Sequence, residues 1–183
     1  MYKIIYNSID TTFNQIFNNK EYYHLLDNKN FIVQSFIQTK GTGRGNKKWS
    51  SPKGNIYLTI NQKCNSNEIL KNSFLICYHI HKFLYKNLCI QTQYKWPNDL
   101  YYNNKKIIGV VSKSKIISNI AYIQTGIGIN TNNNPLNSST SLSKIISKKF
   151  SIFDISNNLI NYLYKVSENN GKVKESRIKV HKL

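Results

Sequence analysis

Four strand-like runs follow one another closely in the second half of the chain and restrict what it can fold into. They are rich in aromatic and β-branched residues and occupy residues 92–96, 100–102, 107–112 and 121–129. The link at residues 103–106 is short and polar, which indicates a hairpin turn between two of the runs. These patterns predict that a β-sheet forms a large part of the fold.

The rest of the chain adds strands and helices. Strand patterns occupy residues 2–6, 31–37 and 56–60. Apolar residues recur at helical spacing in residues 13–26, in a segment that begins near Asn65 and Glu68 and runs through Leu84, and in residues 150–167 with Ser151 as a candidate N-cap. We expect one α+β domain over residues 1–168, in which helices cover a mixed β-sheet, followed by a basic polar tail at residues 169–183 that frays.

The composition favours a soluble, cytoplasmic protein. A chain of 183 residues is long enough for one domain with its own core. No apolar run approaches the ~20 residues needed to cross a membrane, and no secretory signal is visible. The three cysteines lack the spacing of a zinc site or a disulfide framework, so a reducing compartment is expected.

The net charge of +18 has two possible interpretations. Lys and Arg number 26 against 8 Asp and Glu, which suits a surface that binds nucleic acid. Nearly all of the basic residues are lysines, however, and Asn, Ile and Tyr are abundant as well, as expected where A/T-rich codons are favoured. We therefore interpret the charge as compositional bias and expect no specific DNA partner.

A glycine-rich polar segment at residues 38–54 is the first candidate for ligand binding. Gly41, Gly43 and Gly45 alternate, so the backbone can approach a ligand closely and present N–H groups to an anion. Arg44 adds positive charge and Trp49 adds a flat ring. The segment suits a phosphorylated heterocycle such as a nucleotide, although its spacing matches neither a Walker A loop nor a dinucleotide fingerprint.

A second segment, residues 95–109, reads KWPNDLYYNNKKIIG. Pro97 precedes Asn98 and Asp99, so two polar side chains are presented at a bend between strands. Asp99 is a hard oxygen ligand suited to Mg²⁺, and Lys106 lies on the next strand, where the hairpin brings it back toward Asp99. A third segment, GIGIN at residues 126–130, ends a strand in two spaced glycines, which indicates close packing or a ligand.

Together the three segments resemble the catalytic core of the biotin protein ligase family. The family pattern is roughly GRGRxxxxW, then KWPND with a trailing Lys and Gly, then GxGIN, and here these read GTGRGNKKW, KWPNDLYYNNKKIIG and GIGIN. The resemblance covers about residues 2–150, and SSTSL at residues 138–142 is similar to the family's A-T-S-L stretch. It implies the biotin/lipoate ligase catalytic fold and an ATP-dependent ligase that forms biotinyl-5′-AMP.

The resemblance also implies roles for individual residues. Biotin would be bound by Thr11, Thr12, Gln38, Gly41, Gly43, Lys106, Gly109, Val111, Gly126 and Ile129. ATP and the adenylate would be bound by Arg44, Lys47, Trp49, Asn98, Asp99 and Asn130. Arg44, Lys106 and Asp99 would be catalytic, with Asp99 supporting Mg²⁺ and with the Trp49 ring packed on the adenine once the loop closes.

The chain departs from the family pattern in several places. Thr42 replaces the first arginine of the glycine loop, and Phe13 stands where an asparagine usually follows Ser-Thr. We expect no N-terminal helix-turn-helix and no C-terminal β-domain, which argues against a repressor function.

The partner implied by the resemblance is a biotin carboxyl carrier protein, with that of acetyl-CoA carboxylase as the family default, and a homodimer is also expected. Three alternatives stay open: a lipoate or octanoyl ligase or transferase of the same fold, a nucleic-acid-binding module, and an inactive relative. The presence of Arg44, Asp99 and Lys106 argues against the last of these.

Overall fold

The computed structural model describes residues 2–13, 30–65, 72–117, 120–169 and 179–182. Its strands are β1 (Tyr2–Tyr6), β2 (Phe31–Ser35), β3 (Ile56–Asn65), β4 (Gln93–Lys95), β5 (Asp99–Tyr102), β6 (Lys105–Ile117), β7 (Ile120–Ile129) and β8 (Lys179–Lys182). Its helices are the 3-10 turn η2 (Arg44–Asn46), α3 (Asn72–Leu88), α4 (Leu142–Ile146) and α5 (Ile152–Asn169). The predicted helix at 13–26 and the predicted start of α3 near Glu68 fall almost wholly outside the described residues.

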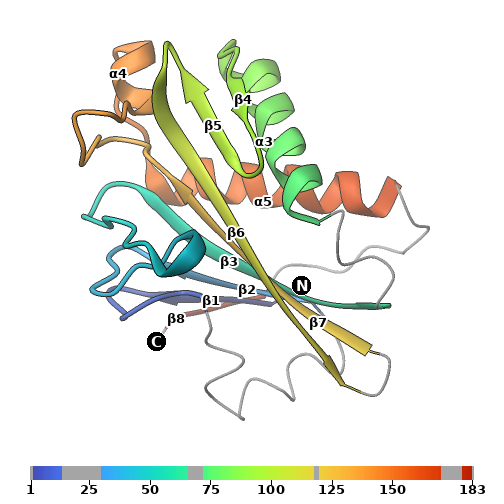
Figure 1. Ribbon diagram of the computed structural model, residues 1–183. Coiled ribbons are helices and arrows are strands. Elements are labelled where there is room, and N and C mark those ends of the chain that lie inside the picture. The colour runs from blue at the N-terminus through green and yellow to red at the C-terminus, as the bar shows by residue number, and fades with distance from the viewer. Residues whose placement is uncertain (1, 14–29, 66–71, 118–119, 170–178, 183) are drawn as a thin grey trace.

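The strands form one mixed sheet in the order β4-β5-β6-β7-β3-β2-β1-β8 (Figure 1). β1 runs parallel to β2 and β8, and the other neighbours are antiparallel. The predicted hairpin is confirmed: Asn103 and Asn104 form a two-residue turn between β5 and β6, both with positive φ. The α+β class predicted from the sequence is therefore confirmed.

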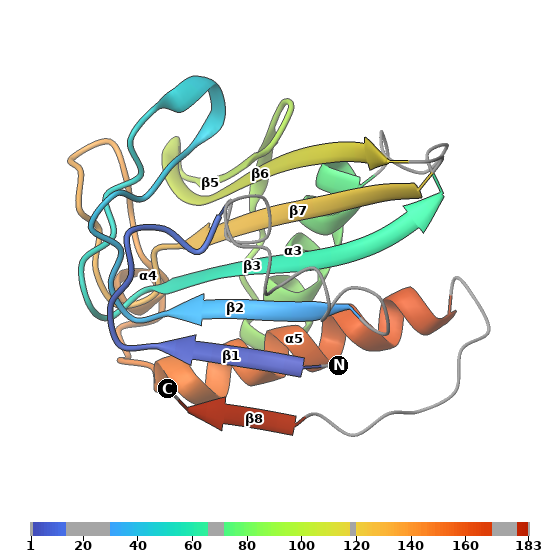
Figure 2. The same cartoon turned by 90° about the horizontal axis from the view of Figure 1, so that it is seen from below.

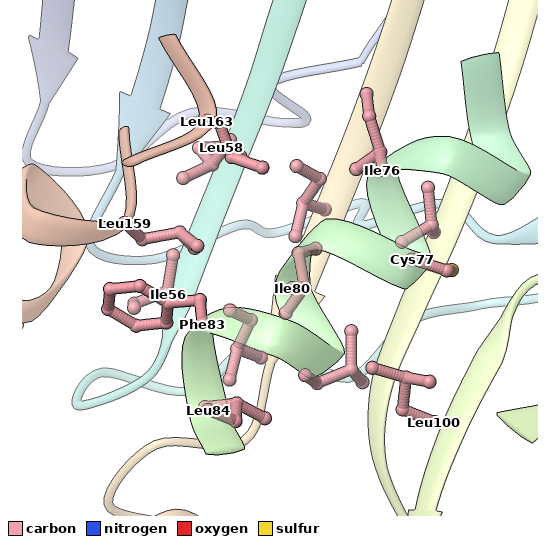
Figure 3. Close-up of a cluster of buried hydrophobic side chains, with 14 of the residues drawn as sticks. Ile56, Leu58, Ile76, Cys77, Ile80, Phe83, Leu84, Leu100, Leu159 and Leu163 are labelled. Carbon is pink, nitrogen blue, oxygen red and sulfur yellow. The ribbon is translucent and has the colours of Figure 1, made fainter. Parts of the chain in front are cut away.

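Both long helices lie on one face of this sheet (Figure 2). The main core lies between them and the strands, where Ile80 and Phe83 of α3 and Leu159 of α5 contact strand residues such as Ile56 and Leu58 (Figure 3). The predicted N-cap of α5 is confirmed, because the Asp154 backbone N–H donates to the Ser151 hydroxyl at 3.3 Å. Within the described residues, no helix is both long and apolar enough to cross a membrane.

Strands β6 and β7 divide their side chains between the two faces of the sheet. Ile108 and Val110 of β6 and Ile127 and Ile129 of β7 belong to the core beneath the helices. Because successive side chains in a strand point to opposite faces, the residues between them face away from the helices. The uncovered face of this part of the sheet is therefore lined by small residues.

Four elements differ from the sequence expectations. β3 runs to Asn65, beyond the predicted end at residue 60, because its pairing with β7 continues to that residue. β6 and β7 pair along almost their whole length, which extends β6 to Ile117, beyond the predicted end at residue 112. The short helix α4 was not predicted; Ser141 caps it by accepting from the Lys144 backbone N–H. Lys179–Lys182, in the segment expected to fray, pairs with β1 as β8, because the open edge of β1 offers backbone partners.

A lysine is buried beneath α5. The Lys3 side chain on β1 is 1% exposed, and its Nζ donates to Asn157 Oδ1 at 2.7 Å and lies 5.4 Å from the Phe153 ring centroid. Burial lowers the pKa of Lys3 from 10.5 to about 8. Between these two values the unfolded chain binds more protons at this position than the folded one, so stability rises as the pH increases.

We expect Lys3→Met to remove this pH dependence. The free energy of unfolding of the wild type, minus that of the variant, should rise between pH 8 and pH 10 by on the order of 1–2 kcal/mol, because only the wild type gains from losing the buried charge. Urea unfolding at several pH values measures the difference. A difference that stays constant over this range would contradict the assignment.

Candidate active site

A cavity of about 620 Å³ lies on the face of β6 and β7 that the helices leave uncovered. The glycine-rich loop closes one side of it, and the bend between β4 and β5 closes another. Its lining combines small residues of the sheet with charged and aromatic side chains of these two segments. The three sequence segments singled out by their composition therefore meet at one place.

Two glycines form the floor of this cavity. Gly109 on β6 pairs with Gly128 on β7, and the Trp49 indole lies against both. A Cβ at Gly128 would lie 2.5 Å from Trp49 Cε2, and one at Gly109 would lie 2.7 Å from Trp49 Cζ3. Only glycine therefore allows the ring to approach the sheet this closely at these two positions.

An ion pair between Lys106 and Asp99 lies beside the Trp49 ring. Lys106 Nζ donates to Asp99 Oδ2 at 2.7 Å and lies 5.1 Å from the Trp49 ring centroid. The Lys106 and Asp99 side chains are 29% and 20% exposed, so the pair is partly shielded from water while still reachable by a ligand. The predicted return of Lys106 toward Asp99 is confirmed.

The backbone around Lys106 is fixed from several sides. Its N–H donates to Ser138 O and its carbonyl accepts from the Thr140 N–H, so residues 138–140 pair alongside β6. The Asn130 side-chain amide donates to the same carbonyl at 3.4 Å. Further along β6, Val110 is held by Asn98, whose side-chain amide donates to the Val110 carbonyl. These hydrogen bonds fix the position of the Lys106 backbone.

A polar chain of side chains lies at another end of the cavity. The Thr12 backbone N–H and hydroxyl donate to Gln38 Oε1 at 2.7 and 3.1 Å, and Gln38 Nε2 donates to the Ser51 hydroxyl at 2.9 Å. The Thr59 hydroxyl on β3 donates to that of Thr12. Thr12 and Gln38 line the cavity. This chain offers both donors and acceptors to a polar ring.

Phe13 occupies the space next to this polar chain. A Cβ on Gly126 would lie 3.1 Å from both Phe13 Cδ2 and Val111 Cγ1. Phe13 itself is buried and lines the cavity. Phe13, at the position where the biotin protein ligase pattern has asparagine, therefore adds an apolar surface to the cavity.

Most of the predicted site residues line the cavity. They are Thr12, Gln38, Gly43, Arg44, Lys47, Trp49, Asn98, Asp99, Lys106, Gly109, Val111 and Gly126.

Four predicted residues lie elsewhere. Ile129 belongs to the core under the helices, because it is one residue away from Gly128 and faces the other side of β7. Asn130 is buried behind Lys106, Thr11 accepts from the Phe13 N–H, and Gly41 packs against Ser51 and the Trp49 backbone.

Several lining residues were not among the predicted binding residues. They are Phe13, Thr42, Gly45, Lys48, Lys95, Trp96, Pro97, Tyr101, Val110, Ile127, Gly128 and Leu136. Gly128 is the second of the two spaced glycines in the GIGIN segment, and strand alternation places it on the same face as Gly126. Leu136 carries no local signal and reaches the cavity only through the tertiary fold.

Polar atoms in and around the site lack protein partners. Among the described residues, Asp99 Oδ1, Trp49 Nε1 and Asn130 Oδ1 are buried without a hydrogen-bond partner. Such atoms are costly unless a ligand or water satisfies them. Cys77 is not an available nucleophile, because burial, with a further contribution from the charge of Asp99, raises the pKa of its thiol to about 12.

We expect Gly128→Ala to displace the Trp49 ring. In a Trp96→Phe background, where Trp49 is the remaining tryptophan, the emission maximum should move to longer wavelength as the indole is pushed toward water. Gly126→Ala is the matched control, because it lies on the same face of β7 and meets Phe13 and Val111 instead of Trp49. Equal shifts in the two variants would contradict the placement of Trp49.

Comparison with known proteins places the chain in one family. The Biotin/lipoate A/B protein ligase family matches residues 7–130. Biotin–protein ligase 2 of Arabidopsis thaliana is 31% identical over 112 residues, which are 56% of this chain and 33% of that protein. The matched segment thus spans about a third of the length of that curated relative.

Solved structures of ligases share the fold. A biotin protein ligase from Aquifex aeolicus, in complex with biotin and ATP, superposes with a TM-score of 0.72 at 23% identity, covering 93% of this chain and 72% of the other. A lipoate complex from P. falciparum superposes with a TM-score of 0.63 at 16% identity, covering 100% and 66%. The chain therefore belongs to the biotin/lipoate A/B protein ligase family and has the fold of a biotin protein ligase catalytic core.

Proposed function

We propose that this protein joins biotin to ATP to form biotinyl-5′-AMP and then transfers the biotinyl group to a lysine of a carrier protein. The observation that carries this proposal is the Lys106–Asp99 ion pair, which lies beside Trp49 in a cavity of about 620 Å³. The related proteins support it: one is a biotin–protein ligase, and the Aquifex aeolicus structure contains biotin and ATP.

We propose a single orientation for biotin in the cavity. The polar chain of Thr12, Gln38 and Ser51 offers partners for the ureido ring, and Gly126, Val111 and Phe13 offer apolar surface for the rest of the ring system. In this orientation the carboxylate would point toward Lys106, which lines the same cavity. Trp49 lies on the Gly109–Gly128 floor between these two ends, so its ring has to move aside for a ligand to lie along the floor.

The first step requires charge neutralisation rather than a protein nucleophile. A biotin carboxylate oxygen attacks the α-phosphorus of ATP, a C–O–P linkage forms, and pyrophosphate leaves. Lys106 Nζ, with three donors, would contact the carboxylate and the α-phosphate while it stays near Asp99. Arg44 and Lys47 of the loop are exposed at the cavity and would bind the phosphates.

Asp99 is the residue that fits a magnesium ion. Its Oδ1 is buried without a partner while Oδ2 is bound to Lys106, so one hard oxygen is available for the ion. Within the described part of the chain, no three His, Cys, Asp or Glu side chains cluster, so the other ligands would be substrate oxygens and water. Mg²⁺ would supply further neutralisation of phosphate charge.

The second step transfers the acyl group. A deprotonated lysine of the carrier attacks the carbonyl carbon of the mixed anhydride, an amide bond forms, and AMP leaves. Burial of the anhydride under the glycine loop and Trp49 would protect it from water. A biotin carboxyl carrier protein is the acceptor that we propose.

We expect Lys106→Ala to reduce biotin-dependent exchange of pyrophosphate into ATP by at least about 100-fold, because it removes the cation nearest to the reacting oxygens. Lys105→Ala is the control: Lys105 is exposed and adjacent in sequence, so its loss should change exchange by less than about twofold. The assay also tests the proposal itself. Wild-type protein that shows no biotin-dependent exchange with Mg²⁺ would overturn it.

A lipoate-type acid is the second candidate substrate. The apolar surface of Phe13 beside Gly126 favours it, and the matching family includes lipoate ligases. Thr12 and Gln38 favour biotin, because the hydrogen-bonding capacity that they keep beyond their mutual contact would meet no polar partner on an apolar ring.

Thermal unfolding distinguishes the two acids. We expect biotin at about a hundredfold excess over its Kd to raise the Tm by about 5 °C or more, and lipoate at the same concentration to leave it unchanged. A rise with lipoate alone would reverse the assignment of the substrate.

A further inference from the structure

An exposed group of aromatic side chains extends from Trp96, which lines the cavity, to helix α3. We call it the aromatic face and define it as Phe74, Tyr78, Tyr94 and Trp96. All four are exposed, and Trp96 is 76% exposed although it also lines the cavity. Exposed aromatic residues gathered in one patch are typical of surfaces that bind another protein.

The aromatic face connects α3 with the bend between β4 and β5. Phe74 and Tyr78 lie one helical turn apart on α3, and the Phe74 ring meets the Tyr94 ring edge-on with centroids 5.4 Å apart. The Tyr94 hydroxyl donates to the Pro97 carbonyl, which holds the ring over the bend that carries Trp96. The patch therefore extends from the helix to the entrance of the site.

The surroundings of the aromatic face are basic. Lys82 lies over the Tyr78 ring at 5.5 Å and Lys95 over the Tyr101 ring at 4.9 Å, and both lysines are exposed. In α3 and β4–β5 the one acidic residue is Asp99, which is paired with Lys106. A partner that covers this face therefore has to be acidic.

The transfer step determines where the partner must dock. A lysine reaches the anhydride with its four-carbon stem, so the protein that carries it must rest directly on the mouth of the cavity. Trp96 borders that mouth, and the rest of the aromatic face continues from it onto α3. Both the apolar contact and the charge are thus next to the point of entry.

We propose that the aromatic face is the docking surface for the acceptor: an acidic carrier domain that inserts its lysine past Trp96 into the cavity. This inference rests on the proposed function and adds the surface that selects the protein substrate. Because the partner is recognised by aromatic contact within a basic surround, its binding should weaken as salt increases.

The test compares Phe74→Ala/Tyr78→Ala with Tyr85→Ala. Tyr85 is the matched control, because it is exposed on the same helix, at 58% against 45% and 44%, yet lies about 16 Å along the axis from Phe74. The probe is an unbiotinylated biotin carboxyl carrier domain of acetyl-CoA carboxylase, labelled for fluorescence anisotropy and titrated without ATP. Neither substituted residue lines the cavity, so pyrophosphate exchange without carrier should stay unchanged.

We expect the double variant to raise the Kd for the carrier domain at least about tenfold, and Tyr85→Ala to change it by less than about twofold. Tyr78→Glu alone should also weaken binding, because it adds a negative charge without removing the Phe74–Tyr94 contact, and it replaces the double variant if that fails to fold. Equal Kd values for wild type and the aromatic-face variants would overturn the proposal.

The other possible occupants give different results. Loss of self-association in the double variant, with carrier binding unchanged, would assign the face to a second copy of the chain and overturn the proposal. Loss of duplex binding with carrier binding unchanged would assign it to nucleic acid, with the same consequence. Absence of pyrophosphate exchange in the wild type would instead overturn the proposed function, and the anisotropy titration separates these cases.

Discussion

The register between β6 and β7 is the constraint on which the site depends. It places Gly109 opposite Gly128 and Val111 opposite Gly126, and both pairs face away from the helices. A shift of one residue would exchange these small side chains for the isoleucines of the core, which would fill the cavity and leave gaps under α3 and α5. Core packing and the shape of the cavity are therefore two results of one pairing, because the isoleucines on one face fix the position of the glycines on the other.

Much of the fold could be predicted from the sequence because its strands carry a strong local signal. The hairpin at Asn103 and Asn104, the cap at Ser151 and the proximity of Asp99 to Lys106 all follow from neighbouring residues. The sheet order and the pairing of β8 with β1 could not be predicted, because they depend on contacts between distant segments. The same distinction holds for the cavity: most of the motif residues line it, whereas Leu136 and the position of the Trp49 ring required the tertiary fold.

The charged residues of this chain differ in how strongly their surroundings affect them. Lysines are abundant in the sequence, and most of those in the described part of the chain are exposed to water, where each contributes little to stability. Two are different: Lys3 is buried beneath α5 with an amide partner, and Lys106 shares the cavity with one of the few carboxylates. The sequence has 26 basic and 8 acidic residues, and this count does not indicate the importance of Asp99. Asp99 matters because it lies in the cavity, where it pairs with Lys106.

The attachment of residues 131–140 to distant strands also has a consequence for the order in which the protein forms. The Asn55 side-chain oxygen accepts from the backbone N–H groups of Thr131, Asn132 and Asn133, and residues 138–140 complete the pairing around Lys106. During synthesis, about the first 140 residues must therefore leave the ribosome before the frame of the site can close. Until the later residues are synthesised, the apolar faces of the early strands stay uncovered. This topology is therefore slow to form and depends on protection from aggregation.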